Sequence, residues 1–531
     1  MRVILLATLG LVAASGATRG QSDGAPAPGT PPGPLWVSNV GTGTFGLAFG
    51  DGGGQLFVAG TQGEAYLYSS FDPDPPEPFA TFALDGFDGL AAGADTTDLY
   101  LAAGFDKVGP TTSQGYVHRY DSSSPLPLWE YSFTPQLLSF PNFDVSRDGE
   151  TVVSSFVLDV PPTNEFRVHD PDTGTVTRLL TYPIQAYSSR FDLSPDGSVF
   201  AHSPYNGTGS VSVLDLATGE VLFTTAGSIP AKQALSRRGG VLVVRERVVG
   251  VAWHLRVFVR GPGGYVEVLD VPTPDTEVPG DLAVSDDGSV VAAGWYDVTH
   301  SHWLVTVRAY DAHTGDLLME RELAGNPLSP LQNVVADLEL SADGSRLALG
   351  VWGAGVIPSA GSVSELTVWD PKADASVASF PDWGSVFELA LSADGTRLAC
   401  HRLSVHATSG YTATFVQLYD VGGADLALHG VPVIGGPLTA DVYGPAGATA
   451  VLLAAAGLAS PPIVGGAGTL YLDPGTLGVV ALATVGAGGI GQLGLTVPSA
   501  PALVGQTLFL QGATLSPVSL GNTTLQVTLL P

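Results

Sequence analysis

Two histidines, His300 and His302, stand two positions apart, close to Tyr296 and Trp303, and form the clearest metal-ligand pattern in the sequence. Residues i and i+2 of a strand point to the same side, so both imidazoles could bind one metal ion. A solvated loop with aromatic packing explains the same residues, and we favour that interpretation. The sequence therefore leaves the metal at this place unknown.

Six acidic residues precede the serine of a repeated Ser-x-Asp-Gly turn. Three of them lie two residues before the serine, and three lie four residues before it. If the strand that carries them lines a central channel, some of these carboxylates could hold a divalent cation. The alternative, which we favour, is that they accept hydrogen bonds from neighbouring repeats or from channel water. The six are Asp144, Asp192 and Glu339 at the nearer position, and Asp281, Asp337 and Glu388 at the farther one.

The sequence contains no recognised catalytic signature. Gly-x-Ser-x-Gly, His-Glu-x-x-His, P-loop and Cys-x-x-Cys motifs are all missing. The absence of these motifs favours a non-enzymatic protein, and the only cofactor we consider is the divalent cation of the channel acids. Catalysis by residues from several distant repeats stays an alternative.

The acidic residues belong to a unit that recurs eight times, about every 49 residues, in which two apolar runs flank a tight turn. Asp-Gly between alternating apolar residues is a strong hairpin signal, because glycine adopts positive φ at no steric cost. Six turns contain Asp-Gly, and two copies are degenerate. The turns lie at Asp51, Asp148, Asp196, Asp287, Asp343 and Asp394, with the degenerate copies at Asp95–Asp98 and Arg238–Gly240.

A second signature with a turn-forming Asp follows about 20 to 25 residues later in six copies, and three of these have the full Asp-x-x-Thr-Gly turn, as at Asp170–Gly174 and Asp311–Gly315. Four short strands without helical spacing predict a four-stranded antiparallel blade, and blades in a ring are a β-propeller. We predict an all-β fold with an eight-bladed propeller, or a seven-bladed one if a degenerate copy is not a blade. The run Leu35–Asn39 is expected to pair with the last blade and close the ring.

The unit resembles the repeat of WD40-type or YVTN-type propellers, from the Ser-Pro-Asp-Gly turn at Ser194–Gly197 to the Trp-Asp dipeptide at Trp369–Asp370. The likeness covers residues 36–428 and implies architecture, not a ligand. The Gly-His dipeptide of many WD40 units is absent from these repeats, which are also longer than the ~40–45 residues typical of that family.

The N-terminus predicts export. Met1–Arg2, the apolar run Val3–Ala14 and the small residues Ser15–Ala17 match a signal peptide over residues 1–17, followed by a disordered spacer over residues 18–34. We therefore expect a secreted or cell-surface protein. The net charge of −29, with 50 acidic and 21 basic residues, excludes the basic patch that nucleic acid requires. A single cysteine, Cys400, allows no internal disulfide.

The composition changes near Gly430. No Lys or Arg lies after residue 402, and after His429 only Asp441 and Asp473 are charged. We predict a propeller over residues 35–429 and a β-sandwich over residues 430–531, because short alternating runs are separated by Gly and Pro. The apolar run Ala446–Ala459 is too short to cross a membrane. The stretch Val497–Gly512, followed by Leu520–Val527, resembles a C-terminal module of secreted bacterial proteins, which implies an extracellular setting.

Binding residues are expected on the face of the propeller that carries the variable loops, opposite the uniform turns. Our leading hypothesis is a monomeric, non-enzymatic propeller that binds a protein or glycan there through Tyr296, His300, His302, Trp303 and Trp352. The alternatives are a lactonase-like hydrolase with a cation in the channel and a structural cell-surface protein. The variable loops are Phe105–Gly115, Val157–Asn164, Tyr205–Gly209, Val249–His254, Tyr296–His302, Trp352–Ser364 and His401–Tyr411.

Overall fold

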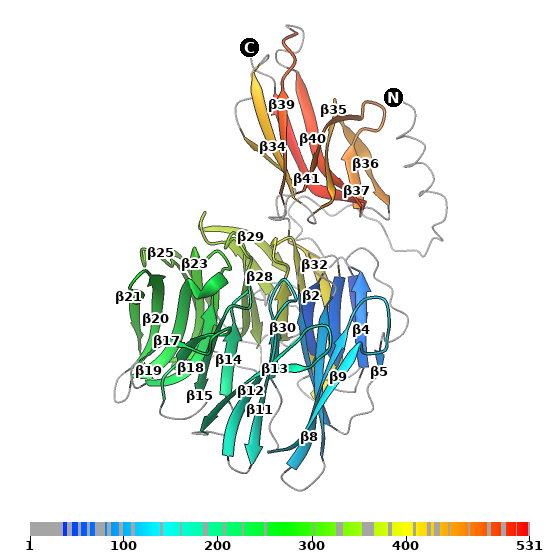
Figure 1. Cartoon of the computed structure of the whole chain (residues 1–531). Coiled ribbons are helices and arrows are strands. Elements are labelled where there is room, and N and C mark those ends of the chain that lie inside the picture. The colour runs from blue at the N-terminus through cyan, green and yellow to red at the C-terminus, as the bar shows by residue number, and fades with distance from the viewer. Residues whose placement is uncertain are drawn as a thin grey trace. The chain divides into compact units, whose positions relative to one another are not determined.

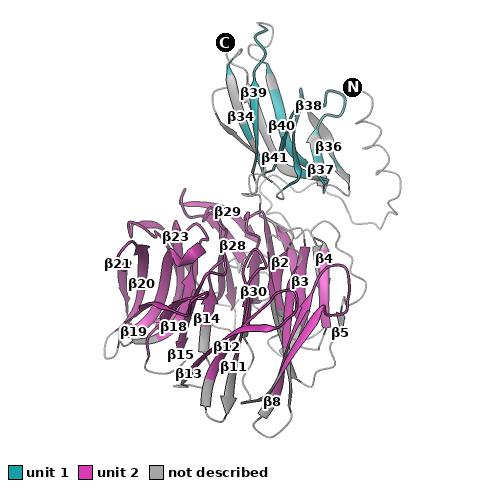
Figure 2. Cartoon of the chain, viewed as in Figure 1, with its two compact units in different colours: residues 1–32, 422–531 teal, residues 33–421 magenta. Residues whose placement is uncertain are grey.

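A computed structural model shows an all-β chain made of antiparallel sheets (Figure 1). The chain divides into two compact units, one of residues 33–421 and the other of residues 1–32 and 422–531 (Figure 2). The predicted signal peptide and spacer lie outside the described residues. The structure describes residues 36–39, 45–50, 55–60, 64–69, 80–81, 86–94, 99–107, 112–137, 142–159, 162–183, 189–204, 209–225, 228–248, 252–274, 276–300, 303–324, 333–352, 366–380, 385–406, 410–421, 426–429, 436–443, 447–465, 468–485, 490–500, 506–516 and 518–528.

Within the described part of residues 33–421 the strands form eight four-stranded sheets, which we number 1 to 8 along the chain. Sheet 1 is β2 (Phe45–Gly50), β3 (Gln55–Gly60), β4 (Glu64–Ser69) and β5 (Ala80–Thr81); sheet 2 is β6 (Gly86–Gly93), β7 (Tyr100–Lys107), β8 (Thr112–Tyr120) and β9 (Trp129–Leu137). Sheet 3 is β10 (Asn142–Val145), β11 (Val152–Asp159), β12 (Pro162–His169) and β13 (Val176–Pro183); sheet 4 is β14 (Ser189–Leu193), β15 (Val199–Pro204), β16 (Ser212–Asp215) and β17 (Val221–Thr224).

The second half continues the same strand order. Sheet 5 is β18 (Ser228–Leu235), β19 (Val241–Val248), β20 (Trp253–Gly261) and β21 (Gly264–Thr273), with the short 3₁₀ turn η3 (Arg237–Gly239) after β18; sheet 6 is β22 (Glu277–Val284), β23 (Val290–Asp297), β24 (Leu304–Asp311) and β25 (Leu317–Ala324). Sheet 7 is β26 (Val334–Leu340), β27 (Leu347–Trp352), β28 (Leu366–Asp370) and β29 (Ala375–Phe380); sheet 8 is β30 (Ser385–Leu391), β31 (Arg397–His406), β32 (Gly410–Asp420) and β1 (Trp36–Asn39).

The first strand of each sheet, which we call the inner strand, contacts the inner strands of the sheets before and after it. These contacts run from β2 through β6, β10, β14, β18, β22, β26 and β30 and return to β2. Adjacent sheets bury apolar side chains between their faces; Val307 of β24, for example, shares a cluster with Val335 of β26 and Leu349 of β27. This is the arrangement of a β-propeller.

The N-terminal strand completes the last sheet, as the sequence predicted. β1 pairs antiparallel with β32, and Trp36 lies opposite Leu418. The hydroxyl of Tyr68 in sheet 1 also donates a hydrogen bond to Ser38 Oγ of β1, with a distance of 2.9 Å. Residues from both ends of the propeller sequence therefore hold sheets 8 and 1 together.

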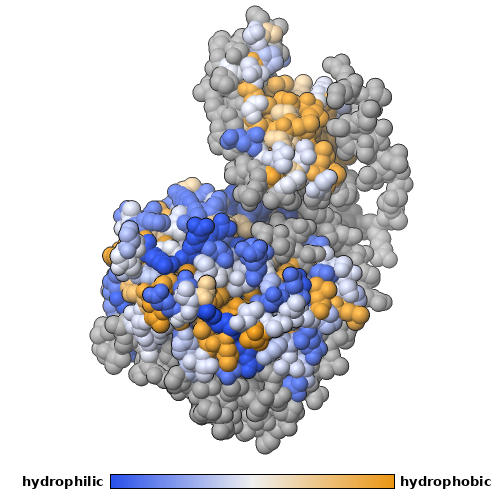
Figure 3. Space-filling model, viewed as in Figure 1, coloured by the Kyte–Doolittle hydropathy of each residue, from blue (hydrophilic) through white to orange (hydrophobic). Residues whose placement is uncertain are grey.

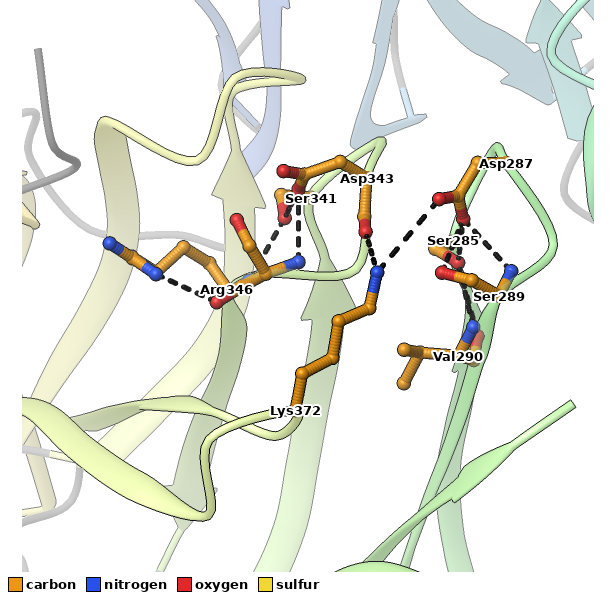
Figure 4. A network of polar contacts seen from close by, with 9 residues as sticks. Ser285, Asp287, Ser289, Val290, Ser341, Asp343, Arg346 and Lys372 are labelled. Carbon is orange, nitrogen blue, oxygen red and sulfur yellow. Dashed lines mark hydrogen bonds and ion pairs between the residues drawn. The ribbon is translucent and has the colours of Figure 1, made fainter. Parts of the chain in front are cut away.

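The Ser-x-Asp-Gly turns have one geometry, which Figure 4 shows for two neighbouring sheets. In the turn of sheet 7, Ser341 Oγ donates to Asp343 Oδ1 at 2.8 Å and accepts a hydrogen bond from the N–H of Arg346 at 3.0 Å. Gly344 has a φ of +67°. Lys372 Nζ donates to the carbonyl oxygen of Asp343 at 2.7 Å and lies 4.0 Å from Asp287 Oδ2 in the turn of sheet 6.

Backbone hydrogen bonds also link the turns of neighbouring sheets. The N–H of Asp287 donates to the carbonyl of Ala342 at 3.0 Å, and the N–H of Ala342 donates to the carbonyl of Ala393 at 2.8 Å. Arg147 and Pro195 make the equivalent bond between sheets 3 and 4. The uniform turns therefore stabilise the contacts between neighbouring sheets as well as each hairpin.

The C-terminal unit contains three sheets in its described residues. One is β33 (Leu426–His429), β34 (Pro437–Tyr443) and β39 (Ile490–Thr496); the second has the order β38 (Gly478–Thr484), β35 (Thr449–Ala455), β40 (Thr507–Leu515) and β41 (Ser519–Thr528); the third is the hairpin of β36 (Leu458–Gly465) and β37 (Gly468–Leu472). Ala440 and Leu493 of the first sheet share a buried cluster with Leu452 and Leu510 of the second. Among the described residues no helix is long and apolar enough to cross a membrane.

Replacement of Gly197 by Ala is expected to destabilise the propeller. A Cβ at this position, where φ is +68°, would lie 2.2 Å from Thr151 Oγ1 of the neighbouring sheet. The left-handed conformation alone costs a non-glycine residue about 1–3 kcal/mol. Denaturant unfolding should show a loss of at least that size, whereas Gly263→Ala, where no atom lies within 4 Å of the added Cβ, should be close to neutral. Equal effects of the two substitutions would contradict the prediction.

A chain shortened to residues 33–421 is expected to unfold cooperatively on its own, because both β1 and β32 are retained and sheet 8 is complete. Thermal unfolding followed by circular dichroism measures this. A second fragment that also lacks β1 should melt at a lower temperature. A gradual, non-cooperative melt of the longer fragment would show that the two units fold only together.

Candidate functional site

The predicted channel acids lie on the inner strands, and five of the six join one sheet to the next. In each case a carboxylate oxygen accepts a hydrogen bond from a backbone N–H on the inner strand of the following sheet. These bonds run from Leu193 N to Asp144 Oδ2 (3.3 Å), from Leu235 N to Asp192 Oδ2 (2.7 Å), from Leu338 N to Asp281 Oδ2 (3.2 Å), from Leu389 N to Asp337 Oδ2 (2.8 Å) and from Leu47 N to Glu388 Oε1 (3.2 Å).

β-Bulges explain why the acids occupy two sequence positions. The register of the inner strand shifts across Gly280 and Asp281 in β22, and just before Asp337 in β26 and Glu388 in β30. These are the three acids that lie four residues before the serine. A bulge bends a strand and re-aims its side chains. Asp144 and Asp192, two residues before the serine, lie on inner strands whose pairing shows no such shift.

Glycines allow the close approach of the sheets at these bulges. A Cβ on Gly280 would lie 2.6 Å from Val335 Cβ of the next sheet, and one on Gly350 would lie 2.4 Å from Val386 Cγ1. Larger residues at these positions would push the inner strands apart. The hydrogen bonds of the carboxylates across the joint depend on this short separation.

Lys232 is a charged residue of the channel that the sequence analysis missed. It follows a register shift on β18 and lies four residues before Ser236, so it occupies in sheet 5 the place that Asp281 occupies in sheet 6. Its ammonium group forms an ion pair and a hydrogen bond with Asp281 Oδ1. The spacing of four residues between Lys232 and Ser236 could have identified this position. It was missed because the turn of this repeat lacks Asp-Gly and because Lys232 is basic where the repeats of sheets 6, 7 and 8 have an acid.

These residues surround a cavity of about 600 Å³. Four aspartates and one lysine supply its charged groups, and three aromatic rings form part of its wall. It is lined by Phe143, Asp144, Phe191, Asp192, Lys232, Gln233, Pro279, Gly280, Asp281, Tyr296, Val334, Val335, Ala336 and Asp337, from sheets 3 to 7.

Burial raises the pKa values of several of the acids, and the charges of neighbouring acids add to this effect at some of them. Burial raises the pKa of Asp144 to about 6 and, with the nearby charge of Glu339, that of Glu388 to about 8. The pKa of Asp192 is raised well above its ordinary value by burial and by the charge of Asp144. Burial therefore favours the protonated form of Asp144, Asp192 and Glu388, and neighbouring acidic groups add to this effect at Asp192 and Glu388.

The Lys232–Asp281 pair behaves in the opposite way. Burial opposes the charged forms of both groups, but their mutual attraction prevails, so the pKa of Asp281 is lowered and that of Lys232 is raised. Burial and the charge of Asp281 raise the pKa of Asp337, whose carboxyl also hydrogen-bonds to Asp281. The cavity thus combines an ionised pair with acids that resist ionisation.

The aromatic residues predicted for the loop face divide between two sheets. Tyr296 lies opposite Val278 at the end of β23 that is away from the Asp287 turn. Its ring stacks on Trp303 with a centroid distance of 5.1 Å and an interplanar angle of 11°. Trp303 itself has a φ of +50°, and its N–H donates to the carbonyl of His300 at 3.1 Å.

Of the other members of that predicted set, the described side chains of Trp352 and His300 make separate contacts. Trp352 lies opposite Val334, also at the end away from the turns, and packs on Phe387 of sheet 8 with a centroid distance of 4.8 Å. His300 Nδ1 lies 3.2 Å from Asp297 Oδ2, and His302 lies outside the described residues. Within the residues that the structure describes, no three His, Cys, Asp or Glu side chains are grouped so that they could hold a metal ion.

The two ends of the channel differ. At the end with the Asp-Gly turns, Arg147 Nε of sheet 3 lies 2.6 Å from Asp286 Oδ2 of sheet 6. These sheets are not neighbours, so the ion pair spans the channel at this end. The cavity residues Pro279 and Val334 lie near the start of their inner strands, at the opposite end.

No protein-family model matches the sequence, and the search of curated proteins found no match. Among solved structures, the chain is similar to the β-propeller domain of Cps50 (Swd1) from Myceliophteria thermophila, with 13% sequence identity and a TM-score of 0.40. The match covers 63% of this chain and 99% of that domain.

The stability of the propeller is expected to fall as the pH rises from about 5 to 9. Glu388 keeps its proton in the folded chain up to about pH 8, whereas the unfolded chain releases it near the ordinary pKa of 4.5. Its contribution is complete below that ordinary value and is lost as the pH passes through about 8. Melting temperatures measured across this range should fall less steeply for Glu388→Gln, whose side-chain carbonyl can still accept the hydrogen bond from Leu47. Glu150→Gln, at an exposed position, should keep the wild-type slope. Identical slopes for all three proteins would refute the assignment.

Proposed function

We propose that this chain is a secreted, non-enzymatic, eight-bladed propeller that binds a protein partner at the channel mouth on the face of the variable loops. Eight four-stranded sheets with cyclic contacts between their inner strands support eight blades over seven. Secretion rests on the features of residues 1–17 alone. The shared core of the two larger C-terminal sheets supports a β-sandwich as an accessory module.

The observation that carries this proposal is the cavity at the loop end of the channel. The Arg147–Asp286 ion pair spans the other end, so a ligand would enter from the loop face. Rigid inner strands, fixed by bonds from sheet to sheet, supply the walls, and the connections at this end vary in length and sequence. Such a site on a rigid scaffold is typical of recognition.

The lining of the cavity favours a positively charged group on the partner. Asp144, Asp192, Asp281 and Asp337 outnumber Lys232, which Asp281 already pairs. Aromatic faces such as that of Tyr296 attract cations as well. A lysine or arginine side chain that entered the cavity would relieve the repulsion that now raises the pKa of Asp192. A protein segment that exposes such a side chain is therefore the ligand we expect, and a glycan is the alternative that the experiment separates.

No observation favours the hydrolase or the structural alternative in the same way. Five of the six acids considered for a channel cation already accept a backbone hydrogen bond across a joint between sheets. These hydrogen bonds stabilise the ring of sheets. The binding hypothesis alone uses the cavity, its charge and its open end together.

The binding proposal predicts that a short fluorescent oligolysine peptide binds the wild-type protein, measured by fluorescence anisotropy at low ionic strength. Asp192→Asn should weaken this binding about tenfold or more, because a carboxyl that a bound cation would ionise is replaced by an amide that stays neutral, while the amide oxygen can still accept the hydrogen bond from Leu235. Asp343→Asn removes one charge at the turn face and should leave binding unchanged.

Two results would contradict this proposal. An equal loss in Asp192→Asn and Asp343→Asn would show that the peptide binds the acidic surface in general. Binding of neutral oligosaccharides that is lost in Tyr296→Ala but retained in Asp192→Asn would assign the site to a glycan instead.

A further inference from the structure

The four-stranded sheet of the C-terminal unit has an unusual edge. β38 pairs with β35 on one side, and the described residues supply no strand on its other side. Val479, Val480 and Leu482 are 44%, 49% and 61% exposed. Ala481 and Ala483 of the same strand pack on the core of the unit. Figure 3 shows a broad apolar area on the C-terminal unit in this view.

Among the residues that the structure describes, nothing gives this edge the usual protection against strand pairing. Natural edge strands carry lysine, proline or inward-pointing charges, or are covered. β38, with the sequence Gly-Val-Val-Ala-Leu-Ala-Thr, has no charge and no proline. A register shift between Leu452 and Leu453 of β35 places a bulge near Val480. Both Val479 and Val480 are exposed there, so the bulge adds to the apolar strip.

The distribution of charge indicates what covers this edge. Almost all of the net charge of −29 lies before His429, since only Asp441 and Asp473 are charged after it. Two copies of the chain repel each other through their propeller surfaces, whereas the C-terminal unit presents β38 without charge. A charged partner would have to lose the hydration of its charges against this apolar strip. A second copy brings the same uncharged strand.

The sequence of β38 also suits pairing with itself. An antiparallel pair about a two-fold axis is the isologous contact of a symmetric dimer. With the axis near Ala481, Val480 of one copy lies opposite Leu482 of the other, and the two apolar side chains form a cross-strand pair. The main-chain groups of both edges then gain partners, as in recognition by strand addition.

We propose that two copies of this chain pair antiparallel through β38 and form a homodimer with a continuous eight-stranded sheet. This replaces the monomer expected from the sequence. It does not depend on the ligand of the propeller, because none of its residues lies in residues 33–421.

Sedimentation velocity on the full mature chain, over a range of concentrations, tests the dimer. The wild-type protein should sediment at twice the monomer mass, and Leu482→Lys should sediment as a monomer wherever the wild type is dimeric, because each lysine would lie opposite Val480 of the other copy and its charge would lose hydration against that apolar side chain. Val518→Lys, which adds the same charge at a residue that is 55% exposed and precedes the opposite edge strand β41, should remain dimeric. Leu482→Thr, which keeps a strand-forming residue, should dimerise more weakly than wild type while its melting temperature is unchanged.

Three outcomes would overturn the proposal. The first is a wild-type chain that stays monomeric at every concentration, which would leave the edge to a partner of other chemistry. The second is a dimer that Leu482→Lys and Leu482→Thr leave intact, which would place the interface elsewhere. The third is an equal loss of the dimer in Val518→Lys, which would show a general effect of charge on the unit.

Discussion

A carboxylate on one inner strand accepts the N–H of the next inner strand, and this hydrogen bond is the contact on which the propeller is built. It satisfies a buried backbone donor that no strand of its own sheet can reach at the joint. It also fixes the distance between neighbouring sheets, which the close approach of Gly280 to Val335 and of Gly350 to Val386 then requires. Because the same bond occurs at five joints, the inner strands form a rigid wall around the channel.

The same bond explains why the channel is acidic. Each of these five joints brings one carboxyl toward the axis. Burial raises the pKa of Asp144, and burial together with neighbouring acids raises the pKa values of Asp192, Asp337 and Glu388. Sheet 5 contributes Lys232 at the equivalent position, and this ammonium group allows Asp281 to remain ionised. The charge of the cavity is therefore a consequence of the hydrogen bonds that join neighbouring sheets, and the Arg147–Asp286 ion pair lies at one end of the channel.

Local sequence signals were sufficient for the hairpins and insufficient for the contacts between them. The Ser-x-Asp-Gly turns predicted the all-β repeat because their geometry depends on four consecutive residues. The roles of Asp337 and Glu339 were not separable in the same way. They lie two positions apart on one strand, and only the bulge at Ala336 decides that Asp337 crosses to Leu389.

Trp352 and β33 show the same limit. Trp352 was assigned to a loop face, but its partner Phe387 lies in another sheet, and no local pattern reveals that contact. The loss of charge near Gly430 marked the change of unit, yet Leu426–His429 already pairs with Pro437–Tyr443, because pairing depends on hydrogen bonds and not on composition. His302, which lies outside the described residues, stays a prediction.

The completion of sheet 8 by β1 also determines the order of events during folding. Its two outer strands, β32 and β1, come from opposite ends of the propeller sequence, so this sheet is completed only when the last repeat has been synthesised. The entropy cost of closing so long a loop rises only slowly with its length, but contacts between distant residues form slowly. Until then the chain is an open arc whose terminal sheets expose apolar faces and an unpaired edge at β32. The period before closure, more than the finished ring, is when such a chain is most prone to associate wrongly with its neighbours.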